Sequence, residues 1–144
     1  MSLGIPNSPA WFPVAVQALV VIAGTEGTCS SSAMAQDLKA HAVFVRRVLA
    51  QLVRAEMVEA REGRAGGYRL ARSADNITLA EVYQAVKIPD TTTKDTVCSN
   101  GVSTHVQNVL DEIGVEGERR LLEVLSHYTL ASVLERVDIS RHLA

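Results

Sequence analysis

The stretch that decides the fold is Gly63-Arg64-Ala65-Gly66-Gly67-Tyr68-Arg69-Leu70, residues 63–70. Adjacent glycines between arginines, followed by alternating polar and apolar residues, predict a tight β-hairpin with a basic tip, because glycine adopts the positive φ angles that such a turn requires. We expect one strand over residues 57–61 and a second over residues 67–71. A hairpin that follows two short helices is typical of a wing.

Two short helices and a turn are expected just before this hairpin. Serines at the end of the loop over residues 28–32 can cap a helix over 32–38, and residues 39–41 form the turn. The next helix, over 42–55, spaces its apolar residues as one buried stripe: Val45, Val48, Leu49 and Leu52. A buried helix over residues 12–25 precedes this unit, and a helix over 79–86, capped by Thr78, follows the hairpin. The pattern predicts a mostly α-helical winged helix-turn-helix.

The side of the 42–55 helix that faces away from this stripe carries Val43, Arg46, Arg47, Ala50 and Arg54. A recognition helix offers such a face to the major groove of DNA. The alternative is an ordinary amphipathic helix whose arginines are solvated. The distribution of charge favours DNA, because residues 39–72 hold eight basic and three acidic side chains although the whole chain has a net charge of −2.

The C-terminal part predicts helices that associate with a second copy. From about residue 103 the helical period returns, and its apolar stripe has no obvious partner in the chain: Val106, Val109, Leu110, Ile113, Leu121, Leu122, Val124, Leu125 and Tyr128. A last helix is expected over 130–137. We therefore divide the chain into a DNA-binding domain over 10–87, a loop over 88–102, and a dimerisation helix with a C-terminal helix over 103–140. The alternative is that the long helix packs on its own domain.

Composition narrows the class of protein further. The apolar run over residues 10–23 lacks the charged region of a secretory signal and is too short to span a bilayer, so we expect a cytoplasmic protein. Two cysteines are too few for a disulfide scaffold or a structural zinc site, and the histidines show no metal spacing. Cys98 and His105 as a nucleophile–base pair lack an orienting acid, so we expect no enzyme.

Three motifs together resemble the Rrf family of bacterial winged helix-turn-helix transcription regulators, of the IscR, NsrR and CymR type. They are Phe44-Val45-Arg46-Arg47-Val48-Leu49, Gly66-Gly67-Tyr68-Arg69-Leu70-Ala71 and Ile77-Thr78-Leu79-Ala80-Glu81-Val82. The start of the last helix at Thr129 also matches, and the resemblance covers about residues 12–137. It implies a homodimer, usually a repressor, in which each wing and recognition helix contacts half of a palindromic operator.

The resemblance implies DNA contacts on the recognition helix and the wing, to which we add Ser32 and His41. On the helix-turn-helix they are Ser32, His41, Val43, Arg46 and Arg47. His41 lies at the turn, where it could cap the recognition helix or contact phosphate. On the wing they are Arg64, Ala65, Gly66, Gly67 and Arg69. An alternative function is a winged helix that binds another protein and no operator. The acidic residues near the wing favour this alternative.

The chain departs from the family pattern where an iron–sulfur cluster would bind. Cluster-bearing members place three cysteines in the loop before the long helix, but here Cys98 matches only the last, Thr92 stands six residues earlier, and Gly101 replaces the histidine. A cluster needs four protein ligands, so we predict a cluster-free branch with no cofactor. A second departure is Glu56, where the family usually has glycine before the wing strand.

Without a cluster, two kinds of signal are alternatives for this regulator: thiol oxidation and a partner protein. Cys98 lies just before the expected start of the long helix, where the helix dipole favours the thiolate. We therefore treat Cys98 as a candidate redox-sensing thiol, with Cys29 as its candidate partner across the dimer. The alternative is that both cysteines are inert.

Overall fold

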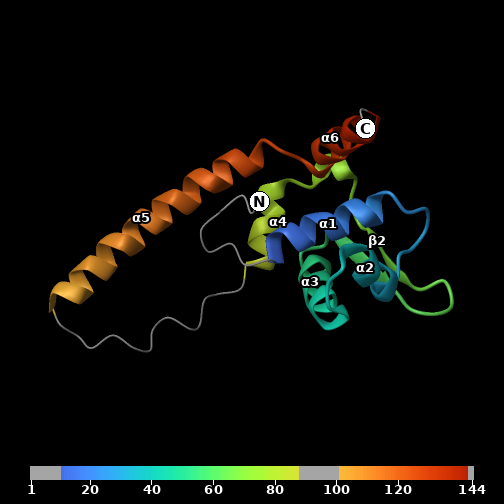
Figure 1. Ribbon diagram of the computed structural model, residues 1–144, viewed down its shortest axis with the longest axis horizontal. Coiled ribbons are helices and arrows are strands. Elements are labelled where there is room, and N and C mark those ends of the chain that lie inside the picture. Colours follow the sequence, from blue (N-terminus) through green and yellow to red (C-terminus); the bar gives the residue numbers. More distant parts are fainter. Residues whose placement is uncertain (1–10, 88–100, 143–144) are drawn as a thin grey trace.

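The computed structural model describes residues 11–87 and 101–142. Over these residues the chain is mostly helical with one antiparallel hairpin (Figure 1), which confirms the predicted fold class. The elements are α1 (Trp11–Ala23), α2 (Ser31–Leu38), α3 (Ala42–Arg54), β1 (Val58–Arg61), β2 (Gly67–Leu70), the 3-10 helix η1 (Ala74–Asn76), α4 (Leu79–Val86), α5 (Gly101–Ser126) and α6 (Leu130–His142). No helix in these ranges is long and apolar enough to cross a membrane.

Helices α1 to α4, the hairpin and α6 gather at one end of the molecule, which we call the head (Figure 1). One apolar core joins them, and it includes the predicted stripe of α3 at 0% exposure for each member. Fully buried side chains from the other elements complete it: Leu19, Met34, Ile77, Val82 and Leu130. Burial of this kind is the main stabilising contribution to such a domain, and it holds α3 in place with one face outward.

The helix-turn-helix is shaped by local capping. The Ser30 side chain accepts a hydrogen bond from Ala33 N, so α2 begins at Ser31, one residue earlier than expected. Lys39 then adopts the left-handed conformation, with φ 51°, and the N–H groups after α2 bond back to its last carbonyls, Ala40 N to Ala35 O at 3.0 Å. This sharp end of α2 directs the chain straight into α3.

The hairpin lies where the sequence predicted it, and its register places Glu59 opposite Arg69 and Ala60 opposite Tyr68. Its strands are one residue shorter than predicted at their outer ends. Glu56, the position where glycine was expected, has φ 59°. Glutamate thus holds the left-handed turn that normally favours glycine, at a cost of roughly 1–2 kcal/mol, and the fold is unchanged.

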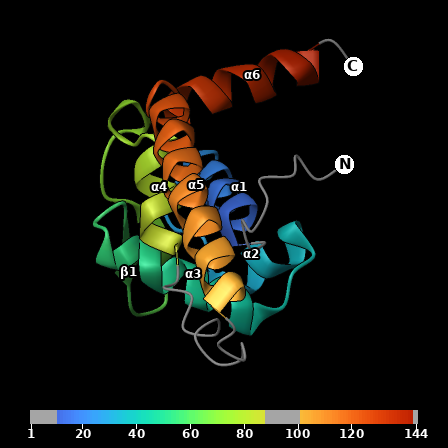
Figure 2. The same cartoon turned by 90° about the vertical axis from the view of Figure 1, so that its left-hand side faces the viewer.

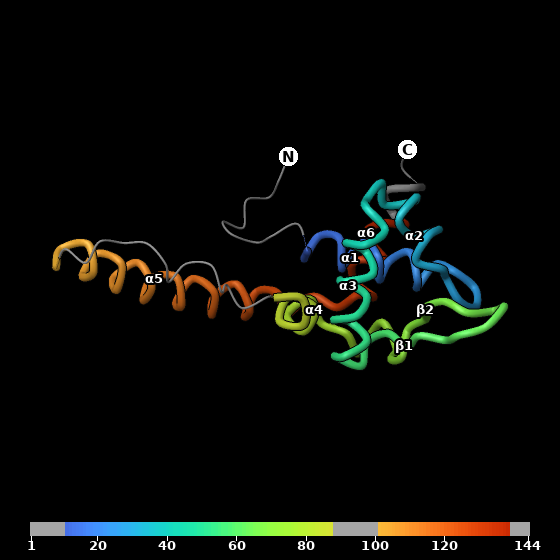
Figure 3. The backbone as a smooth tube through the Cα atoms, turned by 90° about the horizontal axis from the view of Figure 1, so that it is seen from below, coloured from blue at the N-terminus to red at the C-terminus, as the bar shows by residue number. Residues whose placement is uncertain are grey.

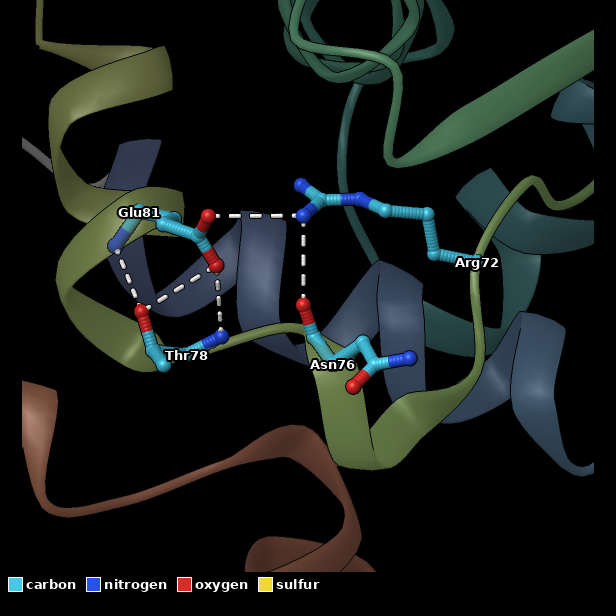
Figure 4. A network of polar contacts seen from close by, with 4 residues as sticks. All are labelled: Arg72, Asn76, Thr78 and Glu81. Carbon is cyan, nitrogen blue, oxygen red and sulfur yellow. Dashed lines mark hydrogen bonds and ion pairs between the residues drawn. The ribbon is translucent and has the colours of Figure 1, made fainter.

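A polar network joins the exit of the hairpin to α4 (Figure 4). Thr78 and Glu81 form a capping box, in which each side chain accepts from the other residue's backbone N–H. Arg72 donates to the carbonyl of Asn76 at 3.1 Å and to the Glu81 carboxylate at 3.3 Å. The backbone N–H of Thr78, followed by Arg72, lowers the pKa of Glu81 below its usual range. These bonds secure the start of α4, the helix that leads toward α5.

Helix α5 extends away from the head, on the side opposite to the hairpin (Figures 1 and 3). It starts two residues earlier than predicted and continues through Gly114 and Gly117, so one uninterrupted helix is confirmed. At about 1.5 Å per residue its length is roughly 39 Å. Its contact with the head lies near its C-terminal end, where Leu125 is buried and Glu118 pairs with Lys87 after α4.

Helix α6 turns across the direction of α5 and returns to the head (Figure 2). Leu130 N donates to Ile77 O at 2.8 Å, and Leu79 N donates to Tyr128 O at 2.9 Å. Leu130 is fully buried in the core. The sequence-based division grouped this helix with α5 in residues 103–140, whereas its packing joins it to η1 and α1. It also extends to His142, beyond the predicted end at residue 137.

Candidate nucleic-acid interface

The outer face of α3 carries the candidate recognition residues. Arg46 and Arg47 are exposed, and Val43 keeps 60% of its surface accessible, although the opposite stripe of the same helix is fully buried. With about 3.6 residues per turn, Val43, Arg47, Ala50 and Arg54 follow one line along the helix, flanked by Arg46. The structure therefore brings together the side chains that the sequence placed on this face.

The N-terminus of α3 is free of side-chain capping. His41 is its N-cap residue, is exposed, and makes no capping hydrogen bond. The first backbone N–H groups of the helix consequently have no side-chain acceptor. Such groups bind phosphate readily, because they point outward at the positive end of the helix dipole.

The wing tip is stiffened by contacts within the chain. Gly66 N donates to Gly63 O at 2.9 Å, and Thr28 Oγ1 donates to Ala65 O at 2.8 Å. Arg64 and Ala65 remain exposed at the tip. The tip is thus attached to the loop before α2, and its arginine faces solvent.

Gly67 joins the wing to the helix-turn-helix. It has φ 149°, and a Cβ atom at this position would lie 2.7 Å from the carbonyl oxygen of Cys29. This close approach lets Cys29 and Tyr68 exchange two backbone hydrogen bonds, of 2.9 and 2.8 Å. The segment just before α2 therefore acts as a third, one-residue strand beside the hairpin. Glycine is required here for both reasons.

Arg69, a candidate DNA contact on the wing, forms an ion pair within the hairpin. Its Nε lies 2.7 Å from Glu59 Oε1, across the hairpin. Because alternate residues of a strand share a face, Arg61 lies on this same face, and it is exposed. Sequence reasoning omitted Arg61 from the candidates. Arg61 could have been found from the sequence, because it lies two residues after Glu59 in the same expected strand and therefore on the same face.

The remaining candidates lie on α2, in the segment before it, or outside the described ranges. Ser32 is exposed in the first turn of α2. Cys29 is 7% exposed in the core, and burial raises the pKa of its thiol, followed by the effect of Asp37. The burial of the Cys29 thiol and its raised pKa both disfavour a reactive thiolate, so they argue against Cys29 as an oxidation partner. Cys98 and Thr92 lie outside the described residues.

The described residues gather no donor set for an iron–sulfur cluster. The sequence has two cysteines, and Cys29 is built into the core through its own backbone pairing with the wing. In residues 11–87 and 101–142, no group of three or more histidine, cysteine, aspartate or glutamate side chains is placed to hold a metal ion. Cluster ligation by four protein side chains would need donors that residues 11–87 and 101–142 do not bring together.

Solved structures share this architecture. A crystal structure of a candidate DNA-binding protein matches with a TM-score of 0.66 and 29% identity, covering 86% of this chain and 98% of that one. IscR of T. potens matches with a TM-score of 0.64 at 22% identity, over 90% of this chain and 86% of its own. CymR, the global cysteine regulator of B. subtilis, matches with a TM-score of 0.65 at 18% identity, over 89% and 95%. The latter two likenesses concern the fold alone.

Sequence comparisons agree with this architecture. A candidate HTH-type transcriptional regulator of Bacillus subtilis (strain 168), YwgB, is 32% identical over 62 residues, which are 43% of this chain and 40% of that protein. The match thus spans about two fifths of that relative's length. A model of the Rrf2 family, described as iron-dependent transcriptional regulators, matches residues 10–136. Since this range is most of the chain, the protein belongs to the Rrf2 family of transcriptional regulators, a family of regulators and not of enzymes.

Proposed function

We propose that the protein is a homodimeric, cytoplasmic repressor that binds a palindromic DNA operator through α3 and the wing. The observation that carries the proposal is the outer face of α3, where exposed arginines lie opposite a fully buried stripe. A helix of this kind fits the major groove, and arginine contacts guanine edges or phosphates. Residues 11–87 would then contact DNA, and α5 would join two copies.

Three features of the head support this assignment of roles. The arginine-bearing face of α3, the uncapped amides after His41 and the exposed Arg64 all offer positive charge to a phosphate backbone. The backbone pairing of Cys29 with Tyr68 holds the wing at a constant distance from α2. A stiff pairing of helix and wing reduces the ordering cost of binding.

The proposed dimer is supported by α5. Its outward side carries Val102, Val106, Val109, Leu110 and Ile113, each between 53% and 76% exposed. Contiguous exposed apolar surface of this kind marks an interaction site. Two-fold symmetry of the protein would match the two halves of a palindromic operator.

The first test is the salt dependence of binding to DNA. Sequencing duplexes selected by the purified protein would identify the operator. The logarithm of its association constant should then fall steeply against the logarithm of salt concentration, by about 0.9 per phosphate neutralised. A flat slope, or no selected sequence, would instead favour the winged helix as a protein-binding module.

The second test uses charge reversal with a matched control. Arg46→Glu with Arg47→Glu should abolish selection without unfolding the protein, because both side chains lie off the buried stripe. Arg47→Glu alone should weaken operator binding about 100-fold, since a favourable contact becomes a repulsion. Arg119→Glu makes the same change in net charge on α5, at an exposed position, and should leave affinity nearly unchanged.

We further propose thiol oxidation as the signal that controls operator binding, with Cys98 as a better candidate for the reactive thiol than Cys29. The burial of Cys29 and its raised pKa disfavour its reaction. Mass spectrometry of oxidant-treated protein, with operator affinity measured in parallel, would locate any modified thiol. Unmodified cysteines with unchanged affinity would leave a partner protein as the proposed signal. The predicted lack of a cluster is tested by iron content after anaerobic purification, where one or two irons per chain would contradict it.

A further inference from the structure

Val43 is the exposed side chain that the proposed function leaves without an explanation. Among the residues that the structure describes, eight large hydrophobic side chains are strongly exposed, and seven of them lie on α5. The eighth is Val43, 60% exposed on α3. A single exposed apolar side chain is ordinary on a protein surface, but Val43 lies on the face that the proposed function brings against DNA.

Val43 lies at the centre of the arginine-bearing face. With about 3.6 residues per turn, Arg46 and Arg47 lie one turn further along, on either side of the line that runs from Val43 to Ala50. The neighbouring Phe44 points to the other side, where its ring packs edge-on against Trp11 with centroids 4.9 Å apart. Val43 is thus held by a well-packed helix, in the first turn, with positive charge on both flanks.

The chemistry of the major groove selects the partner. Valine has no hydrogen-bonding group, so it cannot read the donors and acceptors of base edges. The apolar group that base pairs present in this groove is the C5-methyl of thymine. The N-terminal residues of a recognition helix approach base edges most closely. The flanking arginines favour DNA over an apolar protein surface, because that surface would leave their charges without partners.

We propose that Val43 is a specificity residue that selects a thymine in each operator half-site by packing its isopropyl group against the C5-methyl. This inference rests on the proposed function, since it requires that α3 enters the major groove. It assigns the base that an apolar side chain reads, whereas Arg46 and Arg47 contact guanine or phosphate. Replacing that thymine by another base would remove the contact without changing the charge of the interface.

The test removes the methyl group from either partner. In the selected operator, each thymine is replaced in turn by deoxyuridine, symmetrically in both half-sites, and affinity is measured by fluorescence anisotropy. Deoxyuridine keeps every hydrogen-bonding group of thymine. One position should weaken wild-type binding about fourfold per half-site, the effect of about one buried methyl group. Val43→Ala should bind the normal operator with a similar loss, and should not distinguish thymine from uracil at that position.

Two controls keep the result unambiguous. Arg46→Ala should weaken binding but keep the thymine preference, and circular dichroism should show that Val43→Ala folds normally, since the side chain is exposed. Equal sensitivity of wild type and Val43→Ala to every uracil, or no sensitivity at any thymine, overturns the role of Val43. If salt-dependent operator binding persists in that case, the proposed function stands. If the wild type selects no duplex, both proposals fail and Val43 belongs to a protein contact.

Discussion

The head and α5 use the same kinds of residue in opposite ways. In the head, Val48 and Leu49 are fully buried, whereas Val109, Leu110 and Ile113 on α5 each expose more than half of their surface. Both helices show the amphipathic period in the sequence. The difference arises because α3 has neighbours on its apolar side, while α5 contacts the head near Leu125, at its C-terminal end, and its N-terminal part extends away from the head (Figure 1).

Hydrophobic periodicity in the sequence thus identifies the apolar face of a helix but not what covers that face. The head supplies its own covering elements, so its stability should not depend on protein concentration. The stripe of α5 needs a second surface, which we propose to be another copy of the chain. Stability contributed by association follows mass action and changes with concentration.

The first prediction compares two leucines that differ in burial. Leu49→Ala should lower the free energy of unfolding by about 2–5 kcal/mol at any protein concentration, because it leaves a cavity in the core. Leu110→Ala should destabilise only at concentrations where the dimer forms. Urea unfolding over a hundredfold range of concentration measures both. Equal losses that do not depend on concentration would contradict the contrast.

The second prediction concerns association through α5. Ile113→Glu should raise the dimer dissociation constant about 100-fold, because a carboxylate would be buried in an apolar contact. Val115→Glu is the matched control, since Val115 is 69% exposed but lies on another side of the helix. Sedimentation equilibrium distinguishes the two variants. A wild-type monomer, or equal dissociation of both variants, would break the proposed dimer.

The third prediction concerns the attachment of the wing. Gly67→Ala should cost about 1–3 kcal/mol of stability and weaken operator binding, because the new Cβ would clash with the carbonyl of Cys29 at an unfavourable φ. Gly63→Ala also has a positive φ, of 105°, but no atom within 4 Å of the added Cβ. It should therefore show a smaller loss, from backbone strain alone. Thermal unfolding and anisotropy would measure both effects, and equal losses would show that the close approach does not matter.

The fourth and smallest prediction concerns the acid stability of the head. The pKa of Glu81 is lower in the folded protein than in the unfolded chain, so its contribution to stability is present above the usual carboxyl range and is lost as pH falls through the folded pKa. Glu81→Gln should cost about 0.5 kcal/mol at pH 7, as for a solvent-exposed pair. This difference from wild type should shrink on acidification. Thr78→Ser keeps both bonds of the capping box and should retain the wild-type pH dependence. A Glu81→Gln difference that stays constant in acid would refute the assignment.

Much of the head could be predicted because its signals are local. The stripe of α3, the position of the hairpin and the capping of α4 by Thr78 each depend on residues a few positions apart, and all are confirmed. Helix ends were less certain: Ser30 caps α2 in place of a later serine. Glu56 shows that a turn normally made by glycine survives substitution when the surrounding packing holds it.

The candidate interface was predictable in position but not in detail. The exposure of Val43, Arg46 and Arg47 follows from helical periodicity. The ion pair of Arg69 with Glu59, and the exposed Arg61 beside it, require the pairing of two strands. The roles of these residues in DNA binding stay predictions.

The sequence by itself determined which segments form helices and strands, and which side of each is apolar, because these properties depend on spacing and capping over one or two turns. Only the tertiary structure decided what covers the apolar faces of the head. Cys29 became a buried strand partner of Tyr68, and Leu130 brought α6 back to the core beside Ile77, through contacts between residues far apart in the chain. Such contacts have no periodic signature, because they form where separate elements meet.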